Sequence, residues 1–459
     1  MGGSIFASGP NPLFTPRMPP EVYNHVKARC HRALVELFVC VASPIDGPAK
    51  TTYGDVDILV TWHRKEIFGI SPELPNSGSY TNETDPRSLV HDISKVLGAI
   101  RTISENHGHA HYAIPWPQEF QDIGEKDGDR PRFIQIDVAI SPSLQALQWI
   151  LFRHAHGDLW NILGSMIRGC GLVVDETALS IRIPEIENIN RNRAKIKITD
   201  DPVEVLKVLG LDVNGFRDQP FESLDDLYEY AATSPMFYVR PLPPETAESA
   251  EGDSLAAAQT SATEQAIMED KKVLRSNDRR RMRGRPCYRN WVEDFIPRCR
   301  AEGRFLKQRR TRESVRAEIF AKFPIKAEYD QRLKDFLIER QRHELWNKEI
   351  KEHLLAEYGP NVDPAYRGNM LSAMKKIVLD GDESFGIVPP WPLRDPEGYY
   401  DIERARQFIR EHHKEVGDAA ITINHQKYLQ ALEKKKKQQE VDAREERDVQ
   451  NDGGTSQKL

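Results

Sequence analysis

The sequence predicts an α+β protein, with a small mixed β-sheet, flanking helices and a largely helical C-terminal domain. Two apolar, β-branched runs, DVDILV at 55–60 and RFIQIDVAI at 132–140, have the composition of strands. Between them, apolar side chains recur at helical spacing over 88–104 and predict an amphipathic helix. Beyond residue 268 the chain is strongly charged and rich in helix-forming residues, which predicts the helical domain.

The remaining elements of the first half follow from the same periodicities. A helix is expected from Pro20 to Val41. The later elements are a strand at 112–117, helices at 143–152 and 158–167, a hairpin at 171–183 and helical segments within 202–232, interrupted at 213–220.

Shifts in composition divide the chain into five predicted parts. Gly and Pro are frequent in the first part, and the third is rich in Pro, Ala, Ser and Glu without an apolar period, which predicts flexibility in both. The parts are a flexible N-terminus (1–20), a domain with the predicted sheet (21–236), a disordered linker (237–267), a helical basic and charged domain (268–425) and a charged tail (426–459).

Charge and composition narrow the function classes. No apolar run reaches membrane-spanning length and no signal-peptide pattern is found, so we expect an intracellular protein of the nucleus or cytoplasm with no membrane partner. The five cysteines lack metal-type spacing, which favours reduced thiols. A net charge of −6 argues against a dedicated high-affinity binder of duplex nucleic acid.

Two aspartates stand at the start of the first strand candidate. Side chains at i and i+2 of a strand share a face, so Asp55 and Asp57 lie side by side while Val56, Ile58 and Val60 face the core. Neighbouring carboxylates repel unless a cation lies between them or one is protonated. A strand that merely ends at a turn explains Asp-x-Asp about as well, because Asp is common in turns.

A third acid favours the metal interpretation. Asp137 stands in the middle of the second strand candidate with no turn residue beside it, a position that β-propensity disfavours. Three carboxylates on neighbouring strands can hold two divalent ions about 3.5–4 Å apart, the spacing used for in-line phosphoryl displacement. Mg²⁺, or Mn²⁺ in its place, suits carboxylate and phosphate oxygens.

These motifs occur in an order that resembles the polymerase-β-like nucleotidyltransferase superfamily, and most closely the family X DNA polymerases. The resemblance spans about 40–183. It rests on the turn VASPIDG, the run GDVDILV, the strand FIQIDVAI and the segment LFRHAHGDLWNILGSMIRGCGLVVDETAL, which is similar to the nucleotide-contacting helix and closing hairpin of that family. The resemblance implies a nucleotidyltransferase palm for the predicted sheet.

The resemblance also assigns roles to single residues. Asp55, Asp57 and Asp137 take the place of the catalytic, metal-binding triad, and Asp137 would accept the proton of the attacking hydroxyl. Ser43 matches a turn serine that touches the incoming triphosphate, and Gly54 matches a backbone contact beside the first acid.

The nucleotide-binding positions include a departure from the family. Asp158 and Asn161 match positions that flank the incoming base and sugar. The family turn is Gly-Ser, whereas here it is Ala42-Ser43, and the arginine that usually holds the triphosphate has no counterpart. Lys50 is the expected substitute.

The implied activity is transfer of a nucleoside monophosphate from an NTP or dNTP to a hydroxyl, with release of pyrophosphate. The expected acceptor is a nucleic acid 3′-end. Two alternatives stay open: nucleotidylation of a small molecule or a protein, and a catalytically inactive module that binds nucleotide or nucleic acid.

Two further patterns have a functional and a plain interpretation. His107, His109 and His111 alternate, as do His154 and His156, which fits either a zinc site or loops; a phosphate contact by one of them is a further option. The basic clusters at 271–285 and 304–312 fit a nucleic acid backbone, a nuclear-targeting segment or a solvated helical face.

Overall fold

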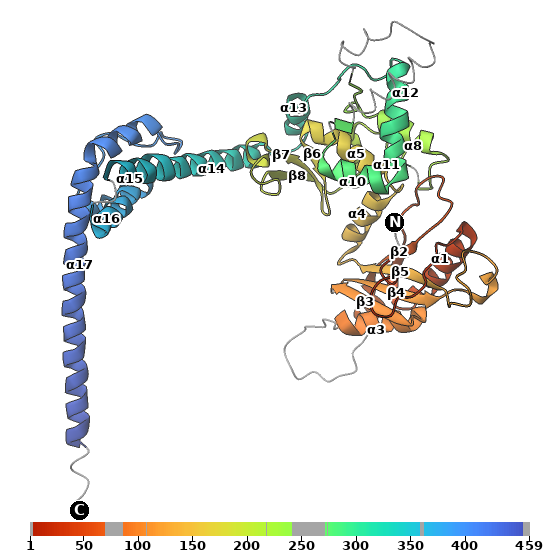
Figure 1. Cartoon of the computed structure of the whole chain (residues 1–459), viewed down its shortest axis with the longest axis horizontal. Helices are drawn as coiled ribbons and strands as arrows, with labels where there is room; N and C mark the ends of the chain where they lie inside the picture. The colour runs from red at the N-terminus through yellow and green to blue at the C-terminus, as the bar shows by residue number, and fades with distance from the viewer. Residues whose placement is uncertain are drawn as a thin grey trace, which may run out of the picture. The chain divides into compact units, whose positions relative to one another are not determined.

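The computed structural model describes residues 3–68, 86–106, 108–216, 218–240, 271–272, 274–358 and 362–452. The chain divides into two compact units, Met1–Lys326 and Ala327–Leu459. Both helices and strands are present, so the predicted α+β class is confirmed (Figure 1). The first unit contains a five-stranded mixed sheet, and helices are the only regular elements among the described residues of the second. None of the helices in the described ranges is long and apolar enough to cross a membrane.

The larger sheet has the strand order β1-β2-β5-β4-β3. Its strands are β1 (Phe38–Ala42), β2 (Asp55–His63), β3 (Arg101–Asn106), β4 (His109–Pro115) and β5 (Phe133–Ile140). β2 and β5 pair in parallel, and every other neighbouring pair is antiparallel. The central parallel pair therefore brings together the two strands that carry the acids.

The core of this sheet lies under α1 (Pro20–Leu34) and α3 (Pro86–Leu97). Val56, Ile58 and Val60 of β2 are buried there with Val22 and Ile93 of the two helices. The alternation of apolar and acidic residues along β2 thus fixes which face packs inward, and the aspartates are left at the opposite face.

Both helices end earlier than the periodicity predicts. α1 stops at Leu34, and β1 begins at Phe38. The β-branched residues of β1 favour an extended backbone, and β1 pairs with β2 as the edge strand of the sheet. α3 stops at Leu97, because Gly98 adopts a left-handed conformation (φ 68°) that ends a helix, and β3 follows. The predicted helices at 20–41 and 88–104 are therefore wrong in their last turns.

A helical region with a second, three-stranded sheet completes the first unit (Figure 1). The predicted hairpin is confirmed as β6 and β7, and β8 was not foreseen. The elements are α2 (Arg64–Phe68), η1 (Gln118–Phe120), α4 (Leu144–His154), α5 (Leu159–Ile167), η2 (Arg168–Cys170), β6 (Leu172–Val174), β7 (Leu179–Arg182), α6 (Pro184–Glu187), β8 (Lys195–Thr199), α7 (Pro202–Leu209), α8 (Leu224–Ala232), α10 (Ser276–Gly284), α11 (Pro286–Asn290), η4 (Trp291–Phe295), α12 (Ile296–Ala301) and α13 (Arg312–Lys322).

Aromatic packing joins the segment after residue 274 to the first unit. The Trp291 ring is buried, and its centroid lies 5.5 Å from that of Tyr228 and 5.0 Å from that of Phe237. The division between the units consequently falls after Lys326, not in the predicted linker at 237–267, most of which lies outside the described residues.

The regular elements of the second unit, in its described residues, are all helices, and a segment without helix at 386–401 precedes the last of them. Its elements are α14 (Lys326–Glu344), η5 (Leu345–Glu352), α15 (His353–Tyr358), α16 (Pro364–Lys375), η6 (Lys376–Asp380), η7 (Glu383–Phe385) and α17 (Ile402–Asp452). Its core includes Leu345, Met374 and Phe408. The predicted charged tail from 426 is, up to Asp452, the far part of α17, whose side chains are exposed through residue 440.

The N-terminal segment packs on the larger sheet, although its Gly and Pro content predicts a loose chain. Phe6 is buried, and Met18 pairs with Tyr53 through two backbone hydrogen bonds of 2.7 and 2.9 Å. Gly3 has a φ of 86°, and a Cβ added there would lie 2.1 Å from the carbonyl oxygen of Gly54. Only glycine fits this close approach, which sets the segment beside the acids.

Candidate metal centre

The three aspartates converge at one edge of the larger sheet. The parallel register of β2 and β5 places Asp57 opposite Asp137 and Asp55 opposite Gln135. One carboxylate oxygen from each aspartate lies within 4.8 Å of the other two. Asp57 is exposed and the other two are half-buried, so the group opens to solvent. The strands on which these acids were expected are the strands that bring them together.

The aspartates repel one another where they stand. Although the Asp57 side chain reaches solvent, protein atoms packed around its carboxyl group disfavour the charged form. Together with the charges of Asp55 and Asp137, they raise the pKa of Asp57 to about 7. Burial and Asp137 likewise raise the pKa of Asp55. Lys50 opposes both shifts, so its ammonium lies close enough to be felt by the two carboxylates. The arrangement is one that a bound cation would stabilise.

Asp137 is held by two side chains. Nδ1 of His111 lies 2.7 Å from Oδ1 of Asp137, and Nε2 of Gln135 donates to both carboxylate oxygens at 2.8 and 3.1 Å. Gln135 is held in turn, because its Oε1 accepts a hydrogen bond of 3.2 Å from the backbone N–H of Ile5. The Asp137 carboxylate is therefore fixed in orientation.

His111 lies between two acids. Its Nε2 is 3.0 Å from a carboxylate oxygen of Glu105, on the side away from Asp137. Burial disfavours the charged ring, but the hydrogen bonds to Asp137 and Glu105 outweigh it and raise the pKa of His111. The imidazolium and the neutral tautomer protonated on Nδ1 both donate to Asp137. In either form the ring holds that carboxylate in place.

The Ala-Ser turn lies beside the triad. The Ser43 hydroxyl donates to the backbone carbonyl of Asp57 at 2.7 Å, and Nε2 of His31 lies 2.8 Å from the same hydroxyl oxygen. Since the single Ser43 proton is used, His31 is the donor in that contact. Ser43 thus connects the turn, helix α1 and the strand that carries Asp57.

Two lysines flank the same turn. Nζ of Lys27 and Nζ of Lys50 each lie 3.5 Å from a carboxylate oxygen of Asp46. The Lys50 ammonium also stands 4.8 Å from the centre of the Tyr53 ring. Lys50 was expected to replace the arginine that the resemblance implies, and Lys27 is a second cation beside the same carboxylate.

The backbone at Gly54 is covered by the N-terminal segment. Gly54 is buried under Gly3, whose backbone N–H donates to Asp55 and lowers the pKa of that carboxyl against the larger effects of burial and Asp137. Asp55 thereby has one hydrogen-bonded oxygen, while its side chain remains half-exposed.

Asp158 and Asn161 occupy the start of α5. The Asn161 amide donates to Oδ1 of Asp158 at 2.9 Å, and Nη1 of Arg285 donates to the same oxygen at 2.6 Å. The neighbouring His156 backbone N–H donates to Ile45 at 2.9 Å, which places this turn against the Ser43 turn. Within the described ranges, neither Asp158 nor Asn161 makes a hydrogen bond or an ion pair with a triad carboxylate.

Two of the alternating histidines, His109 and His111, lie beside Glu105. Glu105, His109 and His111 have ligand atoms within 4.8 Å of one another, but His111 is also hydrogen-bonded to Asp137. His107 lies outside the described residues. His156 is fully buried and His154 is exposed, so that pair does not share a surroundings that suits one ion.

Sequence reasoning missed Lys27, His31 and Gln135 of this centre, and it considered His111 only as a zinc ligand or a phosphate contact. A signal existed for the first two, because positions four apart on a predicted helix share a face. Gln135 stands two residues before Asp137 on the same strand face. Nothing in the sequence pairs His111 with Asp137, since that depends on the register of β4 and β5.

No protein-family model matches this chain, and no curated protein matches it either. The function is therefore inferred from the residues of the centre and their geometry.

Proposed function

We propose that this protein is a metal-dependent nucleotidyltransferase. It transfers a nucleoside monophosphate from an NTP or dNTP to a hydroxyl, which we take to be a nucleic acid 3′-end, and releases pyrophosphate. The observation that carries the proposal is the convergence of Asp55, Asp57 and Asp137 on two paired strands at a solvent-open edge.

The residues fit a divalent cation. The donor set consists of carboxylates, which Mg²⁺ and Mn²⁺ prefer. Burial and the charges of neighbouring aspartates raise the pKa values of Asp55 and Asp57, and a bound cation would offset both effects. When bound, such ions would supply positive charge to the phosphates and to the attacking oxygen.

The side chains around the triad fit the remaining tasks. Asp137, oriented by His111 and Gln135, is placed to accept the proton of the acceptor hydroxyl. The hydroxyl oxygen then bonds to the α-phosphorus as the bond to the β-phosphate oxygen breaks, and pyrophosphate leaves with that electron pair. Lys27 and Lys50, both near the Ser43 turn, can bind phosphate oxygens in the role of the missing arginine.

A direct assay tests the proposal. The full chain is incubated with a panel of α-labelled NTPs and dNTPs, short DNA and RNA acceptors, and Mg²⁺, Mn²⁺ or EDTA. We expect label in the acceptor with either ion and none with EDTA. No transfer under any condition, together with no metal-dependent NTP binding by calorimetry, would contradict an enzymatic role and leave an inactive module.

His111→Phe should reveal the positioning role of this histidine. The substitution keeps a ring but removes the hydrogen bond to Asp137, and loss of a side chain that orients a metal ligand typically costs about 10–100-fold in activity. We expect kcat to fall within that range and to recover in part in His111→Gln, which retains a polar group.

His109→Phe is the matched control, because His109 contacts Glu105 and not Asp137. An equal loss of kcat in His109→Phe, or no recovery in His111→Gln, would show that the histidines act only through folding.

A further inference from the structure

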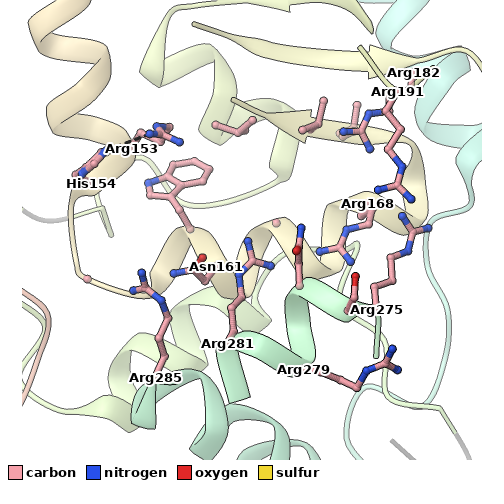
Figure 2. A pocket seen from close by; sticks show the side chains of 18 residues that line it. Arg153, His154, Asn161, Arg168, Arg182, Arg191, Arg275, Arg279, Arg281 and Arg285 are labelled. Atoms are coloured by element: carbon pink, nitrogen blue, oxygen red, sulfur yellow. Dashed lines mark hydrogen bonds between the residues drawn. The ribbon is translucent and has the colours of Figure 1, made fainter. Parts of the chain in front are cut away.

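A cavity of about 790 Å³ lies in the first unit, and no triad residue lines it. Its walls come from the end of α4, from α5, β6 and β7 and from α10. Guanidinium groups from these separate segments surround one space (Figure 2). The lining arginines are Arg153, Arg168, Arg182, Arg191, Arg275, Arg279, Arg281 and Arg285.

Carboxylates neutralise only part of this charge. Asp278, which is 3% exposed, pairs with Arg168 and Arg281, each at 2.7 Å. The other lining pairs are Arg153 with Glu176, Arg182 with Glu187 and Arg285 with Asp158.

Three lining arginines remain without a counter-charge. Arg191, Arg275 and Arg279 have no carboxylate partner in the part of the chain that the structure describes. Burial lowers the pKa of Arg182 despite its pairing with Glu187, and the charges of Arg191 and Arg168 add to that shift. Guanidinium groups without a carboxylate partner are suited to bind phosphate oxygens.

The second basic cluster behaves differently. Arg304, Arg310 and Arg312 pair with Glu229, Glu318 and Glu187, respectively. The cavity is thus distinguished from 304–312 by the convergence of arginines from separate segments around one space.

The cavity also has apolar walls. Trp160 and Leu172 line it, and Nε1 of Trp160 already donates to the carbonyl of Phe152 at 2.7 Å. The indole therefore needs no polar partner from a ligand and offers its ring for stacking. A polyphosphate has no ring that could stack on Trp160. In single-stranded nucleic acids, by contrast, bases stack on aromatic side chains while arginines bind the phosphates.

We propose that this cavity binds a single-stranded segment of nucleic acid, with phosphates on Arg191 and Arg275 and a base against Trp160. The volume is that of a small-ligand site and is enough for one or two nucleotides. The assignment rests on the proposed nucleotidyl transfer for the role of the strand, which is the acceptor. Asn161 and Arg285 line the cavity and both donate hydrogen bonds to Asp158. Asp158 lies in the turn that packs against the Ser43 turn. A strand bound in the cavity could pass along these two turns to reach the triad.

Binding is measured by fluorescence anisotropy of a labelled single-stranded octanucleotide, with RNA and DNA versions. The protein is the full chain carrying Asp137→Asn, in EDTA, so that the result does not depend on metal or catalysis. We expect Arg191→Gln with Arg275→Gln to weaken binding at least tenfold. The slope of log K against log salt should fall by roughly 1.4, because each phosphate contact on a single strand contributes about 0.7.

The matched control is Lys307→Gln with Arg309→Gln, which removes the same charge from exposed positions of the second cluster. It should change affinity less than twofold. Equal losses in the two double variants would overturn the cavity assignment, because general charge would then explain binding. Unchanged affinity in the cavity variant would overturn it too.

Trp160→Leu tests the stacking wall. It should weaken octanucleotide binding roughly 5- to 150-fold and leave inorganic tripolyphosphate binding unchanged. Tripolyphosphate, free ATP or duplex bound as tightly as the single strand would overturn the proposal in favour of that ligand. The melting temperature of each variant identifies misfolding. If Trp160→Leu does not fold, the Arg191→Gln, Arg275→Gln variant still tests the cavity, because both arginines are exposed. Binding without any nucleotidyl transfer by the native protein would refute the enzymatic proposal alone.

Discussion

Asp137→Asn should abolish nucleotidyl transfer while the protein stays folded. The substitution removes a negative charge from the place where the phosphates and the attacking hydroxyl are to meet, and it removes the proposed proton acceptor. Loss of several kcal/mol of transition-state stabilisation corresponds to a decrease of roughly 1,000-fold or more in kcat. The measurement is single-turnover incorporation of labelled nucleotide at saturating Mg²⁺.

The fold should tolerate this change. The asparagine oxygen still accepts from His111 and Gln135, and one of three mutually repelling charges is gone. Without metal, the variant should therefore unfold at the same temperature as the native protein or a higher one. Mg²⁺ should raise the melting temperature of the native protein and not that of Asp137→Asn, because a ligand stabilises only the state that binds it.

Asp122→Asn is the matched control, since Asp122 is a fully exposed acid of the same unit. It should keep native activity and the native response to Mg²⁺. If Asp137→Asn incorporated nucleotide as fast as the native protein, the triad would have no part in the chemistry, and an unchanged response to Mg²⁺ would remove it from metal binding as well.

Asp278→Ala should lower the free energy of unfolding by about 3 kcal/mol, the cost of removing one partner of a buried ion pair. The Asp278 side chain is 4% exposed, and its loss leaves the guanidinium groups of Arg168 and Arg281 without a counter-charge in a site that already has an excess of positive charge. Urea denaturation measures the change.

The stability that Asp278 contributes should decrease in acid. Burial raises the pKa of Asp278, but hydrogen bonds and charges from Arg168 and Arg281 outweigh it and hold that pKa below its usual value. A carboxyl with a depressed pKa in the folded state contributes stability above its unfolded pKa of about 3.9 and loses it as the pH falls through the folded value. The gap between native protein and Asp278→Ala should therefore be full at pH 7 and close in acid.

Asp225→Ala provides the comparison. Asp225 pairs with Arg298 on the surface of the same unit, with 59% and 37% of the respective side chains exposed. An exposed pair contributes about 0–1 kcal/mol, so this variant should be close to native. Equal destabilisation by the two substitutions would show that burial does not set the value of the Asp278 pairs.

The sequence identified the acids because strand periodicity is local. Val56 and Ile58 face the core and Asp55 and Asp57 do not, as the two-residue repeat predicts. The residues at which helices and strands end were harder to predict from the sequence. Gly98 ends α3, and β1 forms because β2 offers it an edge, which is a tertiary effect. β8 alternates lysine with isoleucine over only five residues, too short a pattern to separate from a loop.

The surroundings of the acids could not be read from the sequence. His111 reaches Asp137 through antiparallel pairing of strands, and Arg285 reaches Asp158 across 127 residues. Such contacts depend on register and on how helices pack, which no local pattern encodes. The cavity is the same case, since its arginines come from segments on both sides of the predicted linker.

The parallel pairing of β2 with β5 also bears on how the molecule assembles. Asp57 and Asp137 are brought together only when a long intervening segment, including β3 and β4, has been closed into a loop. Non-local contacts of this kind form slowly, because the chain loses loop-closure entropy before the contacts contribute any stabilising free energy. Divalent-ion affinity should therefore emerge late during refolding, after helical circular dichroism has recovered, and would report completion of the native topology.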